Sequence, residues 1–272
     1  MKFIKIIFSI AIIAFSGCSM PVALVVPRQE PPVTKGKFAA GMQESMQHDE
    51  RSGFYYDFGY DRANLYLNLA VGDPEVIMKI AYFGFTVWID RTGGKNQDQG
   101  FRFPTGIRTR QNQTGGQGGL AVAAGLRGGD VSNLIEISEE IDLIGIYGTS
   151  VRRVKMRDSR IRVIAEVADD VLFYRAVIPY EVLGFGYDPL SARSVINIGL
   201  ETGHFEPPSA SEMRRQRTTS GDMVGRPGGM TGQYPGQYPG RMPDRGMLEQ
   251  RSSEISRLSR PTRLWLALEF ER

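Results

Sequence analysis

The sequence predicts an all-β domain: an antiparallel β-sandwich of the jelly-roll or immunoglobulin-like kind, with one short helix and a long disordered insertion before its last strand. Two observations lead to this prediction. Apolar and polar residues alternate over many short runs, which is the period of a strand with one buried face. The runs also lack the regular intervening helices that a parallel α/β sheet requires.

The first clear strand is predicted at residues 64–71. One face of this strand carries the apolar set Leu65, Leu67, Leu69 and Val71. Gly72 ends it, Asp73 is a residue type that caps helices, and Pro74 suits a first helical position. We therefore expect a short helix over 74–82.

Further strands follow the helix. Residues 85–90 form the next predicted strand, and Gly93-Gly94 turns the chain toward a partner at 100–103. A Gly- and Gln-rich stretch at 105–130 predicts a long loop. The remaining predicted strands lie at 143–147, 160–168, 171–178, 195–201 and 263–271. Asp169-Asp170 is a two-residue link that suits a tight hairpin.

Residues 206–260 differ in composition from the strands around them. They are rich in Pro, Gly, Gln and Arg and include the repeated segment Gly-Gln-Tyr-Pro. Such a composition buries too little apolar surface to fold alone, which predicts disorder. Because the last strand alternates strictly, we expect it to pair with the strands before the insertion. The sandwich domain is then residues 53–272.

The amino-terminal residues have the pattern of an export signal. Lys2 and Lys5 precede a short apolar run, and small residues stand directly before Cys18. The run is too short for a membrane-spanning helix. We interpret residues 1–17 as a signal peptide, and the pattern-poor residues 18–52 as a flexible tether.

The tetrapeptide Phe15-Ser16-Gly17-Cys18 resembles the lipobox of bacterial lipoproteins. The resemblance implies cleavage before Cys18 and attachment of diacylglycerol and a further acyl group, such as palmitate, to that residue. More than one acyl chain gives stable anchoring, so the membrane is the first expected partner. Ser19 is similar to the residue that directs lipoproteins to the outer membrane, which places the chain in the cell envelope.

Charge and cysteine content argue against a nucleic-acid-binding protein and against a domain held by disulfides. The formal net charge of +3 is mild, and no dense basic face is expected, so nucleic acid is not a predicted partner. Cys18 is the only cysteine, so an internal disulfide is ruled out and stability must come from burial.

The residues do not predict an enzyme. The chain has two histidines, His48 in the tether and His204 beside the insertion, and no nucleophile elbow, zinc-binding helix or phosphate loop. We predict no catalytic residue and no cofactor. Two carboxylates would suffice for a glycosidase, which remains the least favoured alternative.

No metal site is predicted either. Calcium prefers carboxylate and carbonyl oxygens, and its weak candidates are Asp57, Asp61 and Asp90 near strand ends. Their spacing does not join them in one motif, and turn or cap roles fit these residues better.

Aromatic residues give the best candidates for ligand binding. Alternation places Trp88 and Trp265 on the polar sides of their strands, and Tyr66 on the outer side of its strand. Sugars stack their apolar ring faces on aromatic rings while polar groups bind the hydroxyls. The alternative is that each tryptophan ring covers a neighbouring strand or lies under a loop, as the amphipathic indole often does.

Three strand segments, Asp61–Leu69, Gly84–Asp90 and Phe173–Pro179, resemble carbohydrate-binding module family 9 and related sugar- or haem-binding sandwiches. The chain is also similar to lipoproteins of Bacteroidetes that carry a Leu-Tyr-Leu strand followed by a Trp-Ile-Asp strand. These motifs concern the fold, so they imply a sandwich and leave the function open.

Together these patterns predict a membrane-anchored lipoprotein that acts as a non-enzymatic binding or assembly module. Its expected partner beyond the membrane is a glycan or another envelope protein. A carbohydrate-binding protein that uses Trp88, Trp265 and Tyr66 is the alternative, and a glycosidase comes last.

Overall fold

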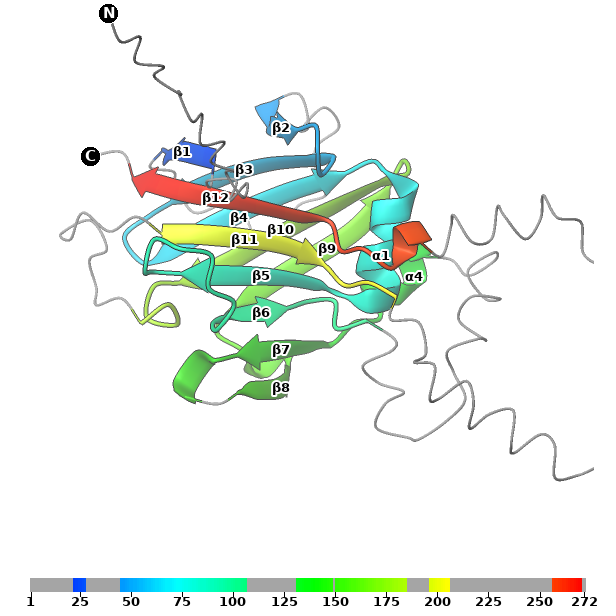
Figure 1. Ribbon diagram of the computed structural model, residues 1–272. Helices are drawn as coiled ribbons and strands as arrows, with labels where there is room; N and C mark the ends of the chain where they lie inside the picture. The colour runs from blue at the N-terminus through cyan, green and yellow to red at the C-terminus, as the bar shows by residue number, and fades with distance from the viewer. Residues whose placement is uncertain are drawn as a thin grey trace, which may run out of the picture.

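Two β-sheets lie face to face in the computed structural model, which describes residues 22–27, 45–106, 131–148, 150–184, 196–205 and 256–270 (Figure 1). The seven-stranded sheet contains, in spatial order, β1 (Val22–Val26), β12 (Arg263–Phe270), β11 (Ile196–Thr202), β5 (Phe85–Asp90), β6 (Gly100–Arg102), β7 (Glu140–Ile144) and β8 (Val151–Lys155). The five-stranded sheet contains β2 (Gln47–Asp49), β3 (Phe54–Tyr60), β4 (Asn64–Val71), β10 (Val171–Pro179) and β9 (Arg162–Ala168). Helices are few and short, namely α1 (Pro74–Phe83), α4 (Val131–Glu136), η2 (Ile146–Gly148) and η3 (Met156–Asp158). The predicted all-β class is thus confirmed.

The core lies between the sheets. The apolar set of β4 is fully buried, as predicted from its alternation. It faces the inner side of β5, where Phe85 meets Phe54 at a ring-centroid distance of 6.1 Å and Tyr174 at 5.1 Å. Each such side chain contributes roughly 1.5–3 kcal/mol through burial, so these inter-sheet contacts hold the layers together.

Helix α1 covers one end of the two sheets (Figure 1). The Asp73 side chain accepts a hydrogen bond from the Glu75 N–H at 2.8 Å, and Pro74 opens the helix as predicted. Gly84 ends it with φ of 91°, a conformation that an L side chain rarely adopts. The cap therefore turns the chain directly into β5.

The hairpin between β9 and β10 confirms the predicted tight turn. Asp169 and Asp170 have φ of 50° and 62°. Two positive φ values define a type I′ turn, whose twist matches the flanking strands. Aspartate tolerates this conformation better than most side chains, which explains the turn without glycine.

The expected tether contains two strands, a difference from the prediction. β1 pairs in parallel with β12, with Val22 opposite Leu266, and β2 pairs with β3. Leu24 and Val26 are buried while Val25 is 63% exposed. Both strands are short and lie at sheet edges, so they have too few residues to show a clear period in the sequence. β1 also depends on a partner that is distant in the chain, whereas β2 pairs with the adjacent β3.

Two further differences lie beside Gly145. β7 covers residues 140–144, earlier than the predicted 143–147, and β8 was not predicted. Gly145 has φ of 62° and a backbone so close to Asp98 that any Cβ would clash, so the strand ends there.

The last strand joins the same sheet as the strands before the insertion, as predicted. β12 pairs antiparallel with β11, and the Phe205 N–H donates to the Leu258 carbonyl at 2.8 Å. Residues 256–258 form a helical turn inside the segment predicted to be disordered. The predicted signal peptide, Cys18, most of the 105–130 loop and residues 206–255 lie outside the described residues. No helix in the described parts is long and apolar enough to cross a membrane.

Candidate binding face on the seven-stranded sheet

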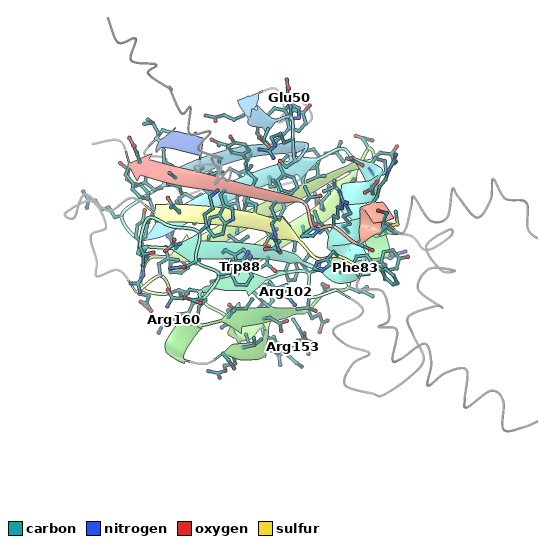
Figure 2. All side chains as sticks on the ribbon, viewed as in Figure 1. Glu50, Phe83, Trp88, Arg102, Arg153 and Arg160 are labelled. Carbon is teal, nitrogen blue, oxygen red and sulfur yellow. The ribbon has the colours of Figure 1, made fainter. Side chains whose placement is uncertain are left out.

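Both tryptophans lie on the outer side of the seven-stranded sheet, in one row across three strands. Gly199 of β11 is opposite Trp265 of β12 on one side and opposite Trp88 of β5 on the other. Both indoles are half-buried. Figure 2 labels Trp88 on the side of the sheet turned to the viewer. The predicted outward placement of both tryptophans is confirmed.

The indoles rest on glycine backbone. A Cβ at Gly199 would lie 2.7 Å from Trp265 Cζ2, closer than real Cβ contacts occur. Gly100, which is opposite Trp88 on β6, is also close to its indole: a Cβ there would lie 3.1 Å from Trp88 Cε3 and 2.4 Å from the Val87 carbonyl oxygen. The absence of side chains at the two glycines leaves room for the flat rings.

Glu201 joins the two tryptophan-bearing strands through hydrogen bonds. Its carboxylate accepts from Trp88 Nε1 at 2.8 Å, from Gln97 Nε2 at 2.7 Å and from the Arg263 guanidinium at 2.7 Å. The Glu201 side chain is only 13% exposed, while that of Arg263 is 50% exposed. We call Trp88, Gly199, Glu201, Arg263 and Trp265 the tryptophan face.

The row through Glu201 continues across the sheet as a ladder of polar side chains. Thr86 accepts from Arg102 Nε at 3.1 Å. Asp142 accepts two hydrogen bonds from Arg153, at 2.6 and 2.9 Å. These bonds to Asp142 raise the pKa of the Arg153 guanidinium. Both arginines are labelled along the same face in Figure 2. The ladder links β5, which carries Trp88, to β6, and it links β7 to β8.

Tyr66 does not belong to this face. It lies on the five-stranded sheet, is 1% exposed, and donates its hydroxyl to Asp61. Burial, together with the Asp61 carboxylate, raises the pKa of Tyr66. The prediction of an exposed outer side chain is wrong here, because Tyr66 lies on a central strand between β3 and β10 and its hydroxyl is bonded to Asp61.

The three calcium candidates lie apart. Asp57 is on β3 opposite Asn68, and Asp61 accepts from the N–H groups of Ala63 at 2.7 Å and Asn64 at 2.6 Å in the β3–β4 turn. Within the described parts of the chain, no group of three or more metal-ligating side chains occurs.

Asp90 holds the loop that follows β5. It accepts from Thr92 N–H at 2.8 Å, Thr92 Oγ1 at 2.6 Å and Asn96 N–H at 3.2 Å. Burial opposes its ionisation, but these hydrogen bonds outweigh burial and keep the pKa of Asp90 below its usual value. Asp90 and Asp61 therefore serve turns, the role that the sequence favoured.

The register separates two carboxylates of the seven-stranded sheet, Asp90 and Glu201, that could be considered as a glycosidase pair. Asp90 is opposite Asn197, whereas Glu201 is opposite Thr86. Four residues of strand correspond to about 13 Å, more than a glycosidase pair spans.

The outer side of the five-stranded sheet carries a cluster that the sequence did not predict. Met46, Ala70 and Phe173 form a small buried group, with Tyr55 packed against it. His48 of β2 stacks on Tyr55 at a centroid distance of 4.2 Å. The sequence analysis assigned His48 to the flexible tether, so it did not predict that His48 lies on this sheet.

Comparison of the chain with protein families, with curated proteins and with solved structures found no match.

Proposed function

We propose that this protein is a lipid-anchored, non-enzymatic binding module of the cell envelope that binds a glycan on the tryptophan face. The observation that carries the proposal is the row of two half-buried indoles on either side of Gly199. We also propose that the sandwich has jelly-roll or immunoglobulin-like connectivity and that it is related to carbohydrate-binding module family 9.

The chemistry of the tryptophan face suits a sugar. Indoles are large and rigid, and they gain contact with apolar sugar faces at little cost in conformational entropy. Glu201 supplies acceptor oxygens and Arg263 supplies donors beside the rings. Because Glu201 is already held by three donors, the polar groups are positioned before a ligand arrives.

Cys18 provides the proposed anchor, on the outer membrane as Ser19 suggests. β1 begins at Val22, four residues later. An extended segment of that length spans at most about 14 Å. The pairing of β1 with β12 therefore supports a position in which the β1 edge lies near the lipid surface.

A glycan array tests the ligand class. We expect wild-type protein to bind a subset of glycans, and Trp265→Ala and Trp88→Ala to reduce that binding at least tenfold. Tyr55→Ala is the matched control, because Tyr55 is a half-buried aromatic residue on the other sheet. Binding that survives both tryptophan substitutions would remove the tryptophan face as the site. In that case another envelope protein becomes the expected partner.

Labelling with radioactive palmitate tests the anchor. Wild-type protein should incorporate the label and sediment with outer membranes, and Cys18→Ser should do neither. Ser19→Asp should keep the label but move the protein to the inner membrane. Labelled Cys18→Ser protein would contradict the anchor, and an unmoved Ser19→Asp protein would contradict only the predicted membrane.

A further inference from the structure

Arg102 of β6 differs from the other arginines in the row through Glu201. Arg263 pairs with Glu201 at 2.7 Å, and Arg153 pairs with Asp142 at 2.6 Å. Arg102 is in register with Asp142, but Arg153 holds both oxygens of that carboxylate. No carboxylate lies within 4 Å of Arg102 among the residues that the structure describes. The row therefore keeps the positive charge of Arg102 uncompensated.

The Arg102 side chain is held on the outer surface of the sheet. Its Nε donates to Thr86 Oγ1 at 3.1 Å. A Cβ built at Gly84 would lie 3.1 Å from Arg102 Cδ, so the glycine leaves room for the arginine stem. The terminal amino groups of the guanidinium have no hydrogen-bond partner in the described parts of the chain. Arg102 thus presents positioned donors before any ligand arrives.

Trp88 and Arg102 project from the same face of the sheet. Gly100 is opposite Trp88, and Arg102 follows two residues later on β6, so it points to the same side. Figure 2 labels both side chains on the side turned to the viewer. Diagonal neighbours of this kind have Cβ atoms about 7 Å apart. A sugar ring stacked on Trp88 would therefore have the Arg102 guanidinium near its edge.

The other charges around Trp88 are compensated or covered. Glu201 is neutralised by Arg263. Asp90 lies two residues beyond Trp88 on β5, on the side away from Thr86, and is 2% exposed beneath the loop that it holds. An anionic group on the ligand is therefore favoured on the Thr86 side of the indole, where Arg102 lies.

A carboxylate matches the donors of Arg102. The planar guanidinium binds a carboxylate through two parallel N–H···O bonds, which are stronger than bonds to a neutral hydroxyl. In a uronic acid the carboxylate is attached at the edge of the pyranose ring. The apolar face of that ring stays free to stack on an indole.

We propose that the tryptophan face binds an acidic glycan, with the ring of a uronic acid on Trp88 and its carboxylate on Arg102. This inference rests on the glycan-binding function proposed above and adds the class of sugar. Arg102 becomes a specificity-determining residue of the face.

Calorimetric titration with oligosaccharides of galacturonate, glucuronate and mannuronate tests the proposal, each beside its methyl ester. The ester keeps the ring and the linkages but removes the charge. Wild-type protein should bind at least one acid about tenfold more tightly than its ester, the gain expected from hydrogen bonds between charged groups.

Arg102→Gln should abolish this preference. Affinity for the acid should fall about tenfold, because the charged partner is lost. Affinity for the ester should stay unchanged, which also shows that the variant is folded. Arg102→Lys should retain part of the preference, because it keeps the charge without the fork of donors. Trp88→Ala should weaken binding of acid and ester alike.

Arg162→Gln is the matched control, since Arg162 is an exposed arginine on the other sheet. It removes the same charge and should leave both affinities unchanged. An equal loss in Arg162→Gln and Arg102→Gln would reduce the effect to general attraction and overturn the proposal.

The remaining outcomes separate this proposal from the proposed function. Equal binding of acid and ester, or binding of neutral or sulfated glycans only, would overturn the uronic acid and leave a glycan-binding face. The absence of binding to any glycan, or binding that survives loss of both tryptophans, would overturn the glycan-binding face itself.

Discussion

The two outer sheet surfaces carry aromatic residues in different ways. On the seven-stranded sheet, Trp88 and Trp265 lie over glycine backbone and remain half-exposed. On the five-stranded sheet, Phe173 is 9% exposed within a cluster of other side chains. Phe173 is also opposite a small residue, Ala70, so an aromatic residue on an outward face is available to a ligand only where no further side chains pack over it.

The two sheets also differ in the sequence distance that their polar contacts span. Glu201 joins strands that neighbour each other in the sheet but are distant in sequence, since Trp88 and its acceptor are 113 positions apart. Asp61 instead holds its own turn and the nearby Tyr66. We therefore expect changes on the tryptophan face to alter ligand binding, and changes around Asp61 to alter mainly stability.

The largest effect is expected from Gly199→Val. The new side chain occupies the space of the Trp265 ring, and overpacking of this kind costs about 3 kcal/mol of unfolding free energy. Because the chain's two tryptophans both lie on this face, intrinsic fluorescence reports on it directly. Urea unfolding followed by fluorescence should show a lowered midpoint, and quenching by acrylamide should increase.

Gly72→Val is the control for that change. No atom lies within 4 Å of a Cβ built at Gly72, and its φ is not positive. The same substitution there should cost less than about 1 kcal/mol. Equal effects at both glycines would contradict the close contact between Gly199 and Trp265.

Tyr66→Phe should cost about 2 kcal/mol, because the buried hydroxyl donates to a charged group. Tyr180→Phe removes a buried hydroxyl that has no hydrogen-bond partner among the described residues, so it should be neutral or stabilising. Thermal unfolding of both variants at pH 7 measures the difference. A similar loss from the two substitutions would argue against the hydrogen bond to Asp61.

The same hydrogen bond predicts a dependence on pH. Burial opposes ionisation of Asp61, but hydrogen bonds from Tyr66, Ala63 and Asn64 outweigh it and lower its pKa in the folded state. The resulting stabilisation is present above the unfolded value of about 3.9 and is lost as pH falls through the lower folded value. Between pH 5 and pH 2, Tyr66→Phe should therefore lose less stability than the wild type.

Glu201→Gln should have a smaller effect on stability, about 1 kcal/mol, because Arg263 is half-exposed and the amide still accepts hydrogen bonds. The fluorescence of Trp88 should change, since its N–H partner is altered. Glycan binding should fall more than stability does. An unchanged emission spectrum would indicate that Glu201 and Trp88 do not bond in solution.

The smallest effect is expected from His48→Ala on the opposite sheet. His48 is exposed and stacks on Tyr55, and such a pair contributes about 0.5 kcal/mol. Binding to any ligand of the tryptophan face should not change. A loss of binding in this variant would mean that the two outer surfaces are coupled.

Much of the fold was predictable because its signals are local. Alternation placed β4, β5 and β12 with the correct inner faces, and Asp73-Pro74 marked the start of α1. The outward placement of Trp88 and Trp265 follows from the same alternation. The signal peptide and the lipid on Cys18 remain predictions, since those residues lie outside the described part of the chain.

What the sequence could not determine depends on which strands become neighbours. Alternation decides that a side chain points outward, because successive Cβ atoms point to opposite faces. It does not decide what lies next to that side chain, because cross-strand register joins residues far apart in the chain. Only the tertiary structure placed Gly199 between the tryptophans, buried Tyr66 and paired β1 with β12.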